Sequence, residues 1–462
     1  MPVHLPTELL DSLEGIKGFD KEAFVNVHES GEQVTTIRVN SFKLSNVKSE
    51  TSDKESFHLS RFTFHEKIPW SEHGYYLSSR PSFTFDPLFH AGCYYVQEAS
   101  SMFLEQALKQ TVDLSKPINV LDLCAAPGGK STHILSLISK DSLLVSNEVI
   151  RSRANILKEN IIKWGCSNVI VTNNDPKDFQ KVENYFDVIV VDAPCSGSGL
   201  FRREPEAIEE WSEQNVMLCS QRQQRILADV LPALKNDGVL IYSTCSYSKQ
   251  EDEQIVEWLK NELKVESLKL KVEDKWRVVE SGNGYRFWPD KLKGEGFFIA
   301  CFKKPGDNDE IDLPKVKAEK FSKHEIGVLD KYIKVDGITF LRHGKMLRAI
   351  PETLLSDINY LSTKFRIVNC GTEIGEIIKD KLVPEHGLAI SNILNEEVPR
   401  IELNYDQSIR YLKKQELELS TDKRGWSIVT FEGHPLGWIN VLSNRINNYY
   451  PKELRILKDQ NT

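Results

Sequence analysis

This sequence of 462 residues contains eight cysteines, but it has no closely spaced cysteine pair. The eight lie singly along the chain and no two form a C-x-x-C pair. Neither a disulfide framework nor a cysteine zinc site is therefore supported. We expect free thiols, a reducing cytosol and no bound metal ion.

Long apolar segments are also missing, because nowhere do about 18 apolar residues run together, as a membrane-spanning helix would need. The start of the chain lacks a basic segment followed by an apolar core. We therefore expect a cytoplasmic protein that is neither secreted nor membrane-spanning. The net charge of −8 argues mildly against a protein that coats itself with nucleic acid, but it does not exclude a local basic groove for RNA.

Apolar segments of strand length alternate with helix-like segments between about residue 117 and residue 302. The strand candidates are "INVLDL", "SLLVSN", "NVIVT", "FDVIVVDAP", "GVLIYSTCS" and "EGFFIACF". Alternation of this kind predicts an α/β fold with a mostly parallel sheet and helices on both faces. Ligands of such sheets bind beyond the carboxyl ends of the strands, near the point where strand order reverses.

Two other regions flank this segment and have a different pattern. The first hundred residues predict a small separate module, with a short strand at "TTIRVN" and a helix after "YYVQEASSM". Residues 302–315, "FKKPGDNDEIDLPK", have the composition of a linker. After the linker, "FSKHEIGVLDKYI" predicts a helix and several strand candidates follow, so we expect a β-rich appendage.

The first strand candidate leads into "CAAPGGKST", a loop of small residues before a helix. Its end, Gly129-Lys130-Ser131, matches a phosphate-binding G-x-x-x-x-G-K-[ST] loop, but Cys124 stands where that loop needs its first glycine. A phosphate-binding loop is therefore not expected. The small residues still let a ligand approach the backbone and the positive end of the following helix.

Acidic residues stand at the ends of the next three strand candidates: Glu148, Asp175 and Asp192. A single acidic residue at such a place is often only a turn or helix cap. Three of them beside a glycine-rich first turn predict a nucleoside site without a phosphate clamp. S-adenosylmethionine, a nucleoside that carries a cationic sulfonium, fits this pattern better than NAD or ATP.

Two cysteines directly follow apolar strand candidates in turns of small residues: Cys195 in "DAPCSGSG" and Cys245 in "YSTCSYSKQEDE". Free cysteines are usually inert packing, and this is what we expect of five others, Cys93, Cys166, Cys219, Cys301 and Cys370. The position of Cys195 and Cys245 at strand ends instead indicates chemistry. Spacing alone does not order the roles of the two.

The motifs "LDLCAAPGGKST", "DAPCSGSG" and "YSTCSYSKQEDE" together resemble the Sun-type family of RNA cytosine-5 methyltransferases. "RREPEAIEEWS" and the terminal "GHPLGWINVLSNRINNYYPKEL" are similar to the bacterial branch typified by RsmF (YebU), which methylates small-subunit ribosomal RNA. The resemblance implies a Rossmann-like S-adenosylmethionine-dependent methyltransferase. Its parts would be an N-terminal RNA-binding module (1–105), a catalytic domain (106–304), an intermediate module (316–378) and a PUA-like RNA-binding domain (379–462).

The resemblance also implies roles for the residues singled out above. Cys245 would attack carbon 6 of the cytosine, Cys195 would help to release the product, and Asp192 would face both base and cofactor. Glu148 would bind the ribose and Asp175 would lie near the adenine. The first loop would line the cofactor site with Cys124, Ala125, Ala126, Pro127, Gly128, Gly129 and Lys130. The sequence departs from the family pattern at Cys124, where alanine is common, and at Ser131, where threonine is common.

The partner that the resemblance implies is RNA, namely 16S ribosomal RNA or the small ribosomal subunit, and we expect a monomer. Three alternatives stay open: a tRNA cytosine-5 methyltransferase, a DNA cytosine-5 methyltransferase, and a non-catalytic RNA-binding assembly factor. The DNA enzymes carry "PCQ" where this chain has "PCS". Arg202-Arg203 could bind phosphate or form surface ion pairs. Tyr449-Tyr450 could stack on bases or belong to the core.

Overall fold

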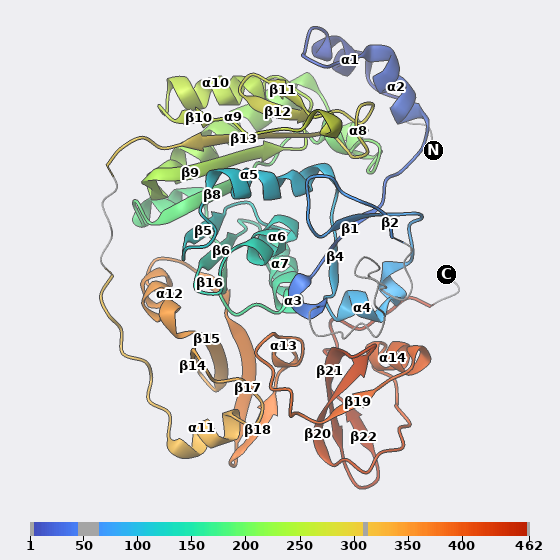
Figure 1. The fold of residues 1–462 in the computed structure, drawn as a ribbon, viewed down its shortest axis with the longest axis vertical. Helices are drawn as coiled ribbons and strands as arrows, with labels where there is room; N and C mark the ends of the chain where they lie inside the picture. The colour runs from blue at the N-terminus through green and yellow to red at the C-terminus, as the bar shows by residue number, and fades with distance from the viewer. Residues whose placement is uncertain (1–3, 45–63, 308–312, 460–462) are drawn as a thin grey trace.

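The computed structural model describes residues 4–44, 64–307 and 313–459, and the strands within these ranges form four sheets (Figure 1). The largest sheet runs from the top of the view to its middle and has helices on both faces. Two small sheets lie side by side at the bottom, and the N-terminal sheet lies at the right. Within the described ranges, no helix combines the length and the apolar character that a membrane crossing needs.

Five parallel strands form the middle of the ten-stranded sheet, in the order β7-β6-β5-β8-β9. Strand order reverses between β5 and β8, which is where α/β sheets bind ligands. This arrangement confirms the predicted Rossmann-like α/β fold. The strands are β5 (Asn119–Asp122), β6 (Leu143–Asn147), β7 (Val169–Thr172), β8 (Phe186–Asp192) and β9 (Leu234–Thr244).

Antiparallel strands extend the sheet on both sides of this parallel core. Four of them lie beyond β9, where β13 pairs with β9 and the others follow. These are β10 (Glu266–Leu268), β11 (Val279–Ser281), β12 (Gly284–Phe287) and β13 (Phe297–Lys303). At the opposite edge, β16 (Ile367–Cys370) pairs with β7.

Side chains that alternate along each strand sort the core into two layers, because neighbouring residues of a strand point to opposite faces. In β8, Val188 and Val190 pack into one apolar cluster, while Ile189 and Val191 pack into the other. The first layer includes α5 (Leu104–Thr111), α6 (Gly129–Leu137) and α7 (Arg151–Trp164). The second includes α9 (Glu213–Val230), α10 (Glu253–Asn261) and α12 (Leu355–Ser362).

The N-terminal module has a four-stranded antiparallel sheet in the order β2-β3-β1-β4. Its strands are β1 (Thr36–Val39), β2 (Phe64–Lys67), β3 (Gly74–Leu77) and β4 (Tyr94–Val96). Its helices are α1 (Thr7–Leu13), α2 (Lys21–Glu29), α3 (Ser41–Leu44) and α4 (Pro87–His90). Leu9 and Phe24 of the first two helices pack with Tyr247 and Trp288, which places this module beside the loop after β9.

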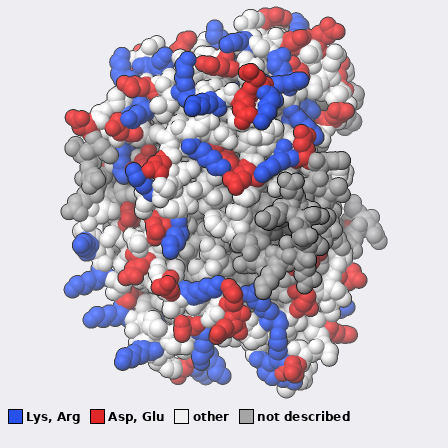
Figure 2. Space-filling model, in the orientation of Figure 1, with Lys and Arg blue, Asp and Glu red and all other residues white. Residues whose placement is uncertain are grey.

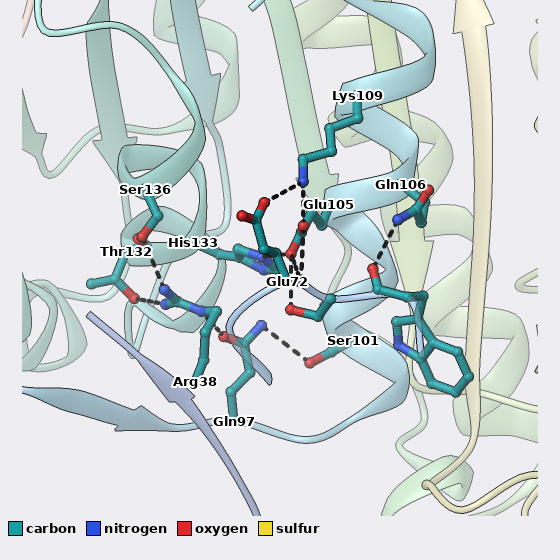
Figure 3. Close-up of polar contacts among 12 residues, drawn as sticks. Arg38, Glu72, Gln97, Ser101, Glu105, Gln106, Lys109, Thr132, His133 and Ser136 are labelled. Atoms are coloured by element: carbon teal, nitrogen blue, oxygen red, sulfur yellow. Dashed lines mark hydrogen bonds and ion pairs between the residues drawn. The ribbon is translucent and has the colours of Figure 1, made fainter. Parts of the chain in front are cut away.

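Arg38 of β1 is buried and links the N-terminal sheet to the first turns of α6 (Figure 3). Its guanidinium donates to Thr132 Oγ1 (2.6 Å), to the Gly129 carbonyl (3.3 Å) and to Gln97 Oε1 (2.9 Å). A fourth bond reaches Ser136 Oγ at 3.2 Å. Burial lowers the pKa of Arg38 to about 9, which still leaves it charged at neutral pH. The N-terminal module is therefore attached to the helix that follows the first loop.

A second buried link joins α5 to α6 and to the turn before β3 (Figure 3). Glu105 accepts hydrogen bonds from Lys109 Nζ (2.6 Å) and Ser71 Oγ (2.8 Å), and it lies 3.2 Å from His133 Nε2. Burial lowers the pKa of His133 to about 4, so this ring is neutral at pH 7. Lys109 then supplies the positive charge that helps to keep Glu105 ionised.

The C-terminal part of the chain forms the two lower sheets. One contains β14 (Ile338–His343), β15 (Met346–Pro351), β17 (Thr372–Ile378) and β18 (Lys381–Pro384), with α11 (Lys323–Leu329) and α13 (His386–Ala389) nearby. The other contains β19 (Arg400–Glu402), β20 (Gly425–Phe431), β21 (His434–Val441) and β22 (Ile446–Asn448), with α14 (Tyr405–Leu412). Ile439 of this second sheet and Ile37 of the N-terminal sheet belong to one apolar cluster, so the two ends of the chain pack together.

The predicted linker does not separate two independent parts of the chain, because the module after it packs on the central sheet. The linker overlaps β13, which ends at Lys303, and residues 308–312 lie outside the described residues. Within the predicted intermediate module, β16 completes the edge of the central sheet and Phe365 packs on Phe179 with ring centroids 4.6 Å apart. The central sheet and this module therefore share a core. The domain boundaries themselves stay a prediction.

Candidate active site

The loops after β8 and β9 meet because these strands are parallel neighbours, with Asp192 opposite Ser243 in the register. The loops carry Cys195 and Cys245, and the two sulfur atoms lie 3.1 Å apart. Both thiols are partly accessible. The structure thus brings together the two cysteines that the sequence singles out, whereas five others are buried: Cys93, Cys166, Cys219, Cys301 and Cys370.

Small residues allow the two cysteine loops to approach each other. The Gly199 amide donates to the Cys245 carbonyl at 2.8 Å, and the Tyr247 amide donates to Ser198 Oγ at 2.9 Å. A Cβ on Gly199 would lie only 2.7 Å from the Cys245 carbonyl oxygen, and 2.5 Å from that of Gly296. A larger residue at Gly199 would therefore push the loops apart.

Asp192 and Lys130 form an ion pair beside the thiols. Lys130 Nζ lies 2.7 Å from Asp192 Oδ2, and Ser243 Oγ donates to the other carboxylate oxygen at 2.8 Å. Burial alone would lower the pKa of Lys130, but the charge and hydrogen bond of Asp192 outweigh it and raise that pKa. Lys130 is therefore an ammonium ion at the edge of the thiol pair.

Cys195 is held in its protonated form. Its pKa is raised well above the usual value, first by the hydrogen bond with Cys245, then by burial, and further by the charges of Cys245 and Glu251. A protonated thiol can donate a hydrogen bond to the sulfur beside it. The two sulfur atoms thus form a hydrogen-bonded pair in which either thiol can be the donor.

The loop from Cys124 to Lys130 follows β5 and is held in place by α7. Asn160 Nδ2 donates to the Pro127 carbonyl at 2.8 Å, and Arg153 donates to the Ala126 carbonyl at 2.9 Å. Gly128 precedes α6 with a φ of +114°, a conformation that other residues rarely adopt. The amino end of α6 therefore follows a loop of mostly small residues, and a ligand can approach it.

Three carboxylates surround this loop. Burial raises the pKa of the Cys124 thiol, and the charges of Asp122, Asp192 and Glu148 raise it further, in that order. Glu148 is buried, accepts from the Ile150 amide at 2.9 Å and lies 3.6 Å from Arg153. The place of Glu148 beside the loop is consistent with ribose binding, which stays a prediction.

Asp175 differs from the other acidic residues because it is exposed and caps a short 3-10 helix, Pro176–Lys181. Its Oδ1 accepts from the Lys177 amide at 3.0 Å. The cap accounts for an acidic residue at this place without any ligand. The adenine contact that the family resemblance implies for Asp175 stays a prediction.

Asp122 is a residue that the sequence analysis missed. It ends β5 beneath the loop, is fully buried, and accepts from Ser131 Oγ at 2.6 Å. Its other oxygen, Oδ1, has no hydrogen-bond partner among the described residues. Burial raises the pKa of Asp122 to about 7. The "LDL" that precedes the loop was the available signal, but in sequence an acidic residue inside an apolar strand does not show where it points.

Glu251 is a second residue that the sequence analysis missed. It lies in the acidic "QEDE" after the second cysteine motif, and it is fully buried against both cysteine loops. An acidic run of this kind is usually a solvated surface, so its residues do not indicate from sequence that Glu251 is buried.

The residues left open in the sequence are now placed. Arg202 is buried, donates to the carbonyls of Glu32 and Gly294, and lies 3.6 Å from the Glu295 carboxylate. Its role is therefore structural, whereas Arg203 is exposed. Tyr450 is buried and Tyr449 is partly exposed, with its ring edge-on to that of Trp426. Figure 2 shows Lys and Arg interspersed with Asp and Glu on the visible face, with no continuous basic surface there.

Comparisons with known proteins cover nearly the whole chain. The family described as 16S rRNA methyltransferase RsmB/F matches residues 109–303. The N-terminal domain of 16S rRNA methyltransferase RsmF matches residues 5–99, and the methyltransferase RsmF PUA domain matches residues 398–456. The three matched segments contain, in order, the N-terminal sheet, most of the central sheet and the second lower sheet.

Individual relatives agree with these matches. The ribosomal RNA small subunit methyltransferase F of Shewanella piezotolerans is 31% identical over 91% of this chain and 90% of its own length. The enzyme of the same name from Pectobacterium atrosepticum is 32% identical over 69% of this chain and 67% of its own. The solved structure of PH0851 has a TM-score of 0.56 at 25% identity, over 65% of this chain and 66% of its own. NSun6 from Pyrococcus horikoshii, at 19% identity and a TM-score of 0.52 over 66% of this chain and 99% of its own, shares the fold.

Proposed function

Because the chain belongs to the family of the ribosomal RNA small subunit methyltransferases F, we propose that it methylates small-subunit ribosomal RNA at carbon 5 of a cytosine. S-adenosylmethionine is the methyl donor. The observation that carries the cytosine assignment is the distance of 3.1 Å between the sulfur atoms of Cys195 and Cys245, at the ligand-binding edge of the sheet. Methylation of an oxygen or an exocyclic amine would need no thiol there.

Carbon 5 of cytosine is a poor nucleophile and has to be activated before it can accept a methyl group. In the proposed reaction the thiolate of Cys245 adds to carbon 6 and breaks the 5,6 double bond, which makes carbon 5 nucleophilic. The carbon then takes the methyl group and gives its proton to a general base. The electron pair of that C–H bond restores the 5,6 double bond as the bond between Cys245 and carbon 6 breaks. The cysteine is regenerated, so no oxidant or reductant is consumed.

Asp192 and Lys130 support the addition step. Negative charge builds on the base as the thiolate adds, and a fixed ammonium ion within a partly buried site stabilises such charge. Asp192 holds Lys130 at 2.7 Å and offers a carboxylate for the hydrogen-bonding edge of the base. We assign Asp192 the role of binding that edge, where its carboxylate accepts from the neighbouring amine, or from N3 once that nitrogen carries a proton.

Cys195 acts later in the proposed cycle. Because its raised pKa keeps it protonated before the reaction, Cys195 does not compete with Cys245 for the first attack. We assign it a role in the elimination that frees the methylated base. The order of the two roles follows the family resemblance, and the protonated state of Cys195 supports it.

The residues around the first loop fit the cofactor. A sulfonium cation suits a site that lies between the carboxylates of Glu148 and Asp192. Asp122 Oδ1, buried and without a partner among the described residues, is an acceptor for a cationic or hydroxyl-bearing ligand. Bound there, S-adenosylmethionine supplies an electrophilic methyl group.

RNA binding would involve the parts on both sides of the catalytic domain. We propose that residues 1–105 and the PUA-like domain at residues 379–462 bind the RNA around the target base. The enzyme would act as a monomer in the cytoplasm, on 16S rRNA or on the small subunit. An alternative with the same chemistry is a tRNA substrate, and an alternative without chemistry is an RNA-binding assembly factor.

Methyl transfer from labelled cofactor to RNA tests the enzymatic proposal against the assembly factor. Bisulfite sequencing of ribosomal and transfer RNA, from cells with and without the gene, then identifies the substrate. We expect one or a few cytosines of 16S rRNA to lose their resistance to conversion when the gene is deleted. Loss confined to transfer RNA would overturn the ribosomal assignment.

A further inference from the structure

Glu251 joins the two cysteine loops through one side chain. Its Oε1 accepts from the Ser196 amide at 2.9 Å, while its Oε2 accepts from Ser196 Oγ at 2.5 Å and from Ser246 Oγ at 2.6 Å. Ser196 directly follows Cys195, and Ser246 directly follows Cys245. One buried carboxylate therefore contacts the residue next to each thiol.

The position of Glu251 is itself fixed by two buried side chains. Gln223 of α9 donates through Nε2 to Glu251 Oε1 and to the Pro194 carbonyl, both at 3.1 Å. The Tyr242 hydroxyl donates to the backbone carbonyl of Glu251 at 2.6 Å. Four donors thus converge on the carboxylate, and none of the contacts is exposed to solvent competition.

We propose that Glu251 is the positioning residue of the reaction, and that its carboxylate holds the loops of Cys195 and Cys245 at the separation that lets both thiols act on one base. The proposal rests on the proposed function, because addition at carbon 6 and later elimination both need a sulfur at the same ring. Among the described residues, the hydrogen bonds of the Glu251 carboxylate are with Ser196, Ser246 and Gln223, so it acts on the thiols through Ser196 and Ser246.

The neighbours of Glu251 do not share this task. Asp252 accepts from Thr244 Oγ1 at 2.7 Å, and Glu253 binds the guanidinium of Arg286 at 2.6 Å. Arg286 in turn donates to the Tyr247 carbonyl at 3.0 Å. These two acids hold the loop of Cys245 from one side, whereas Glu251 is the acid that contacts both loops.

Two substitutions of Glu251 distinguish the effect of its side-chain length from the effect of its charge. Glu251→Gln keeps the length and an oxygen for the Ser196 amide, and its amide nitrogen can donate to a serine hydroxyl. Glu251→Asp keeps the charge but withdraws the carboxylate by one methylene, so it cannot contact both serines. Exposed Glu257 of the adjoining α10 offers a matched control, Glu257→Ala.

Steady-state methylation gives the first measurement, with kcat expressed per cofactor-binding site from calorimetry. We expect Glu251→Asp to lose about 100-fold in kcat with little change in cofactor affinity, because small misplacements of reacting groups are that costly. Glu251→Gln is expected to retain at least about a tenth of the activity, since neutral hydrogen bonds are weaker than charge-assisted ones. A role of the charge alone would reverse this order, and equal kcat for Glu251→Asp and Glu257→Ala would also overturn the proposal.

Disulfide formation gives a second measurement that does not depend on methylation. Diamide takes two hydrogens from two thiols as their sulfur atoms join, and the rate reports how often Cys195 and Cys245 lie in contact. Mass spectrometry of the linked peptides should show fast linkage in the wild type and Glu251→Gln, and linkage at least about tenfold slower in Glu251→Asp. Equal rates in all variants would overturn the positioning role. A wild type that links its thiols normally but methylates no RNA would instead overturn the proposed function.

Discussion

The guanidinium of Arg38 donates a hydrogen bond of 2.6 Å to the hydroxyl of Thr132, across the boundary between the N-terminal sheet and α6. The same guanidinium binds the carbonyl of Gly129, one residue after the glycine that precedes the helix. The N-terminal module therefore contacts the part of the chain that follows the first loop. It fixes the helix whose amino end faces the proposed cofactor site.

Removing this link should weaken cofactor binding from a distance. We expect Arg38→Met to lower the affinity for S-adenosylmethionine by about tenfold and the free energy of unfolding by about 2–4 kcal/mol, because several buried acceptors lose their donor. Calorimetry and urea unfolding measure the two effects. Arg80→Met, at an exposed arginine of the same module, serves as the control. Equal affinity in both variants would show that α6 keeps its place without Arg38.

The two acidic residues assigned to the nucleoside can be tested without disturbing the fold. Glu148→Gln keeps an acceptor for the Ile150 amide, and Asp175→Asn keeps an acceptor for the Lys177 amide. We expect each to weaken S-adenosylmethionine binding by about 1–3 kcal/mol while the melting temperature stays close to that of the wild type. If Asp175→Asn binds the cofactor normally, Asp175 is only the helix cap that the structure shows.

Acid should destabilise this protein through its buried histidines. Burial is the main cause that lowers the pKa of His28, His90, His133 and His434 to about 4, and that of His386 to about 3. Below the ordinary pKa of 6.5 the unfolded chain binds protons at these residues and the folded chain does not, so stability falls as pH falls toward 4. Asp122 and Glu295, whose pKa values burial raises to about 7, oppose this trend, as do Glu251 and Asp252, whose pKa values burial also raises, and together they reduce its size.

The expected size of the acid effect follows from the number of protons taken up. Each proton bound only by the unfolded chain costs about 1.4 kcal/mol per pH unit, so the loss between pH 7 and pH 5 should reach a few kcal/mol. Urea unfolding at these two values measures it. An unfolding free energy that does not change, or that rises toward pH 5, would show that these histidines are protonated in the folded protein.

The region after the predicted linker should be needed for the stability of the catalytic sheet. Removing residues 316–462 would leave β7 as an uncovered edge and would expose Phe179 and its neighbours, because β16 and Phe365 cover them. We expect this truncation to be insoluble, or to lack a cooperative thermal transition. A soluble fragment with normal cofactor affinity would mean that the central sheet tolerates the loss of β16.

This region also shows that sequence patterns can predict a strand but not its partner in a distant part of the chain. The apolar run in "FDVIVVDAP" predicts a strand that is buried on both faces. In β8, Val188 and Val190 pack on one face and Ile189 and Val191 on the other. Nothing local in residues 367–370 indicates that they pair with β7, nearly two hundred residues earlier in the chain. Strand pairing over such a distance depends on the tertiary fold, so the sequence predicted an appendage where the structure has a shared sheet.

The site residues likewise fall into those that could be predicted from the sequence and those that could not. Cys195 and Cys245 could be predicted because the ends of parallel strands gather at one edge of a sheet, and Asp192 and Lys130 lie beside them. Asp122 and Glu251 could not, since burial and hydrogen-bond partners are properties of the folded chain. From the sequence alone, Asp122 is an unexplained acidic residue in an apolar strand, and Glu251 is one of several acidic residues in a run that is typical of an exposed surface.

The two thiols provide the most direct test of the chemistry. Cys245→Ala should abolish methyl transfer and form no covalent RNA adduct, because no sulfur remains to attack carbon 6. Cys195→Ala keeps the attacking sulfur but impairs elimination, so the enzyme should stay bonded to methylated RNA and migrate as a retarded species on a denaturing gel. The double variant should lose that species, since trapping needs a prior attack. If Cys245→Ala traps RNA and Cys195→Ala forms no adduct, the roles of the two sulfur atoms, 3.1 Å apart, are exchanged in this protein.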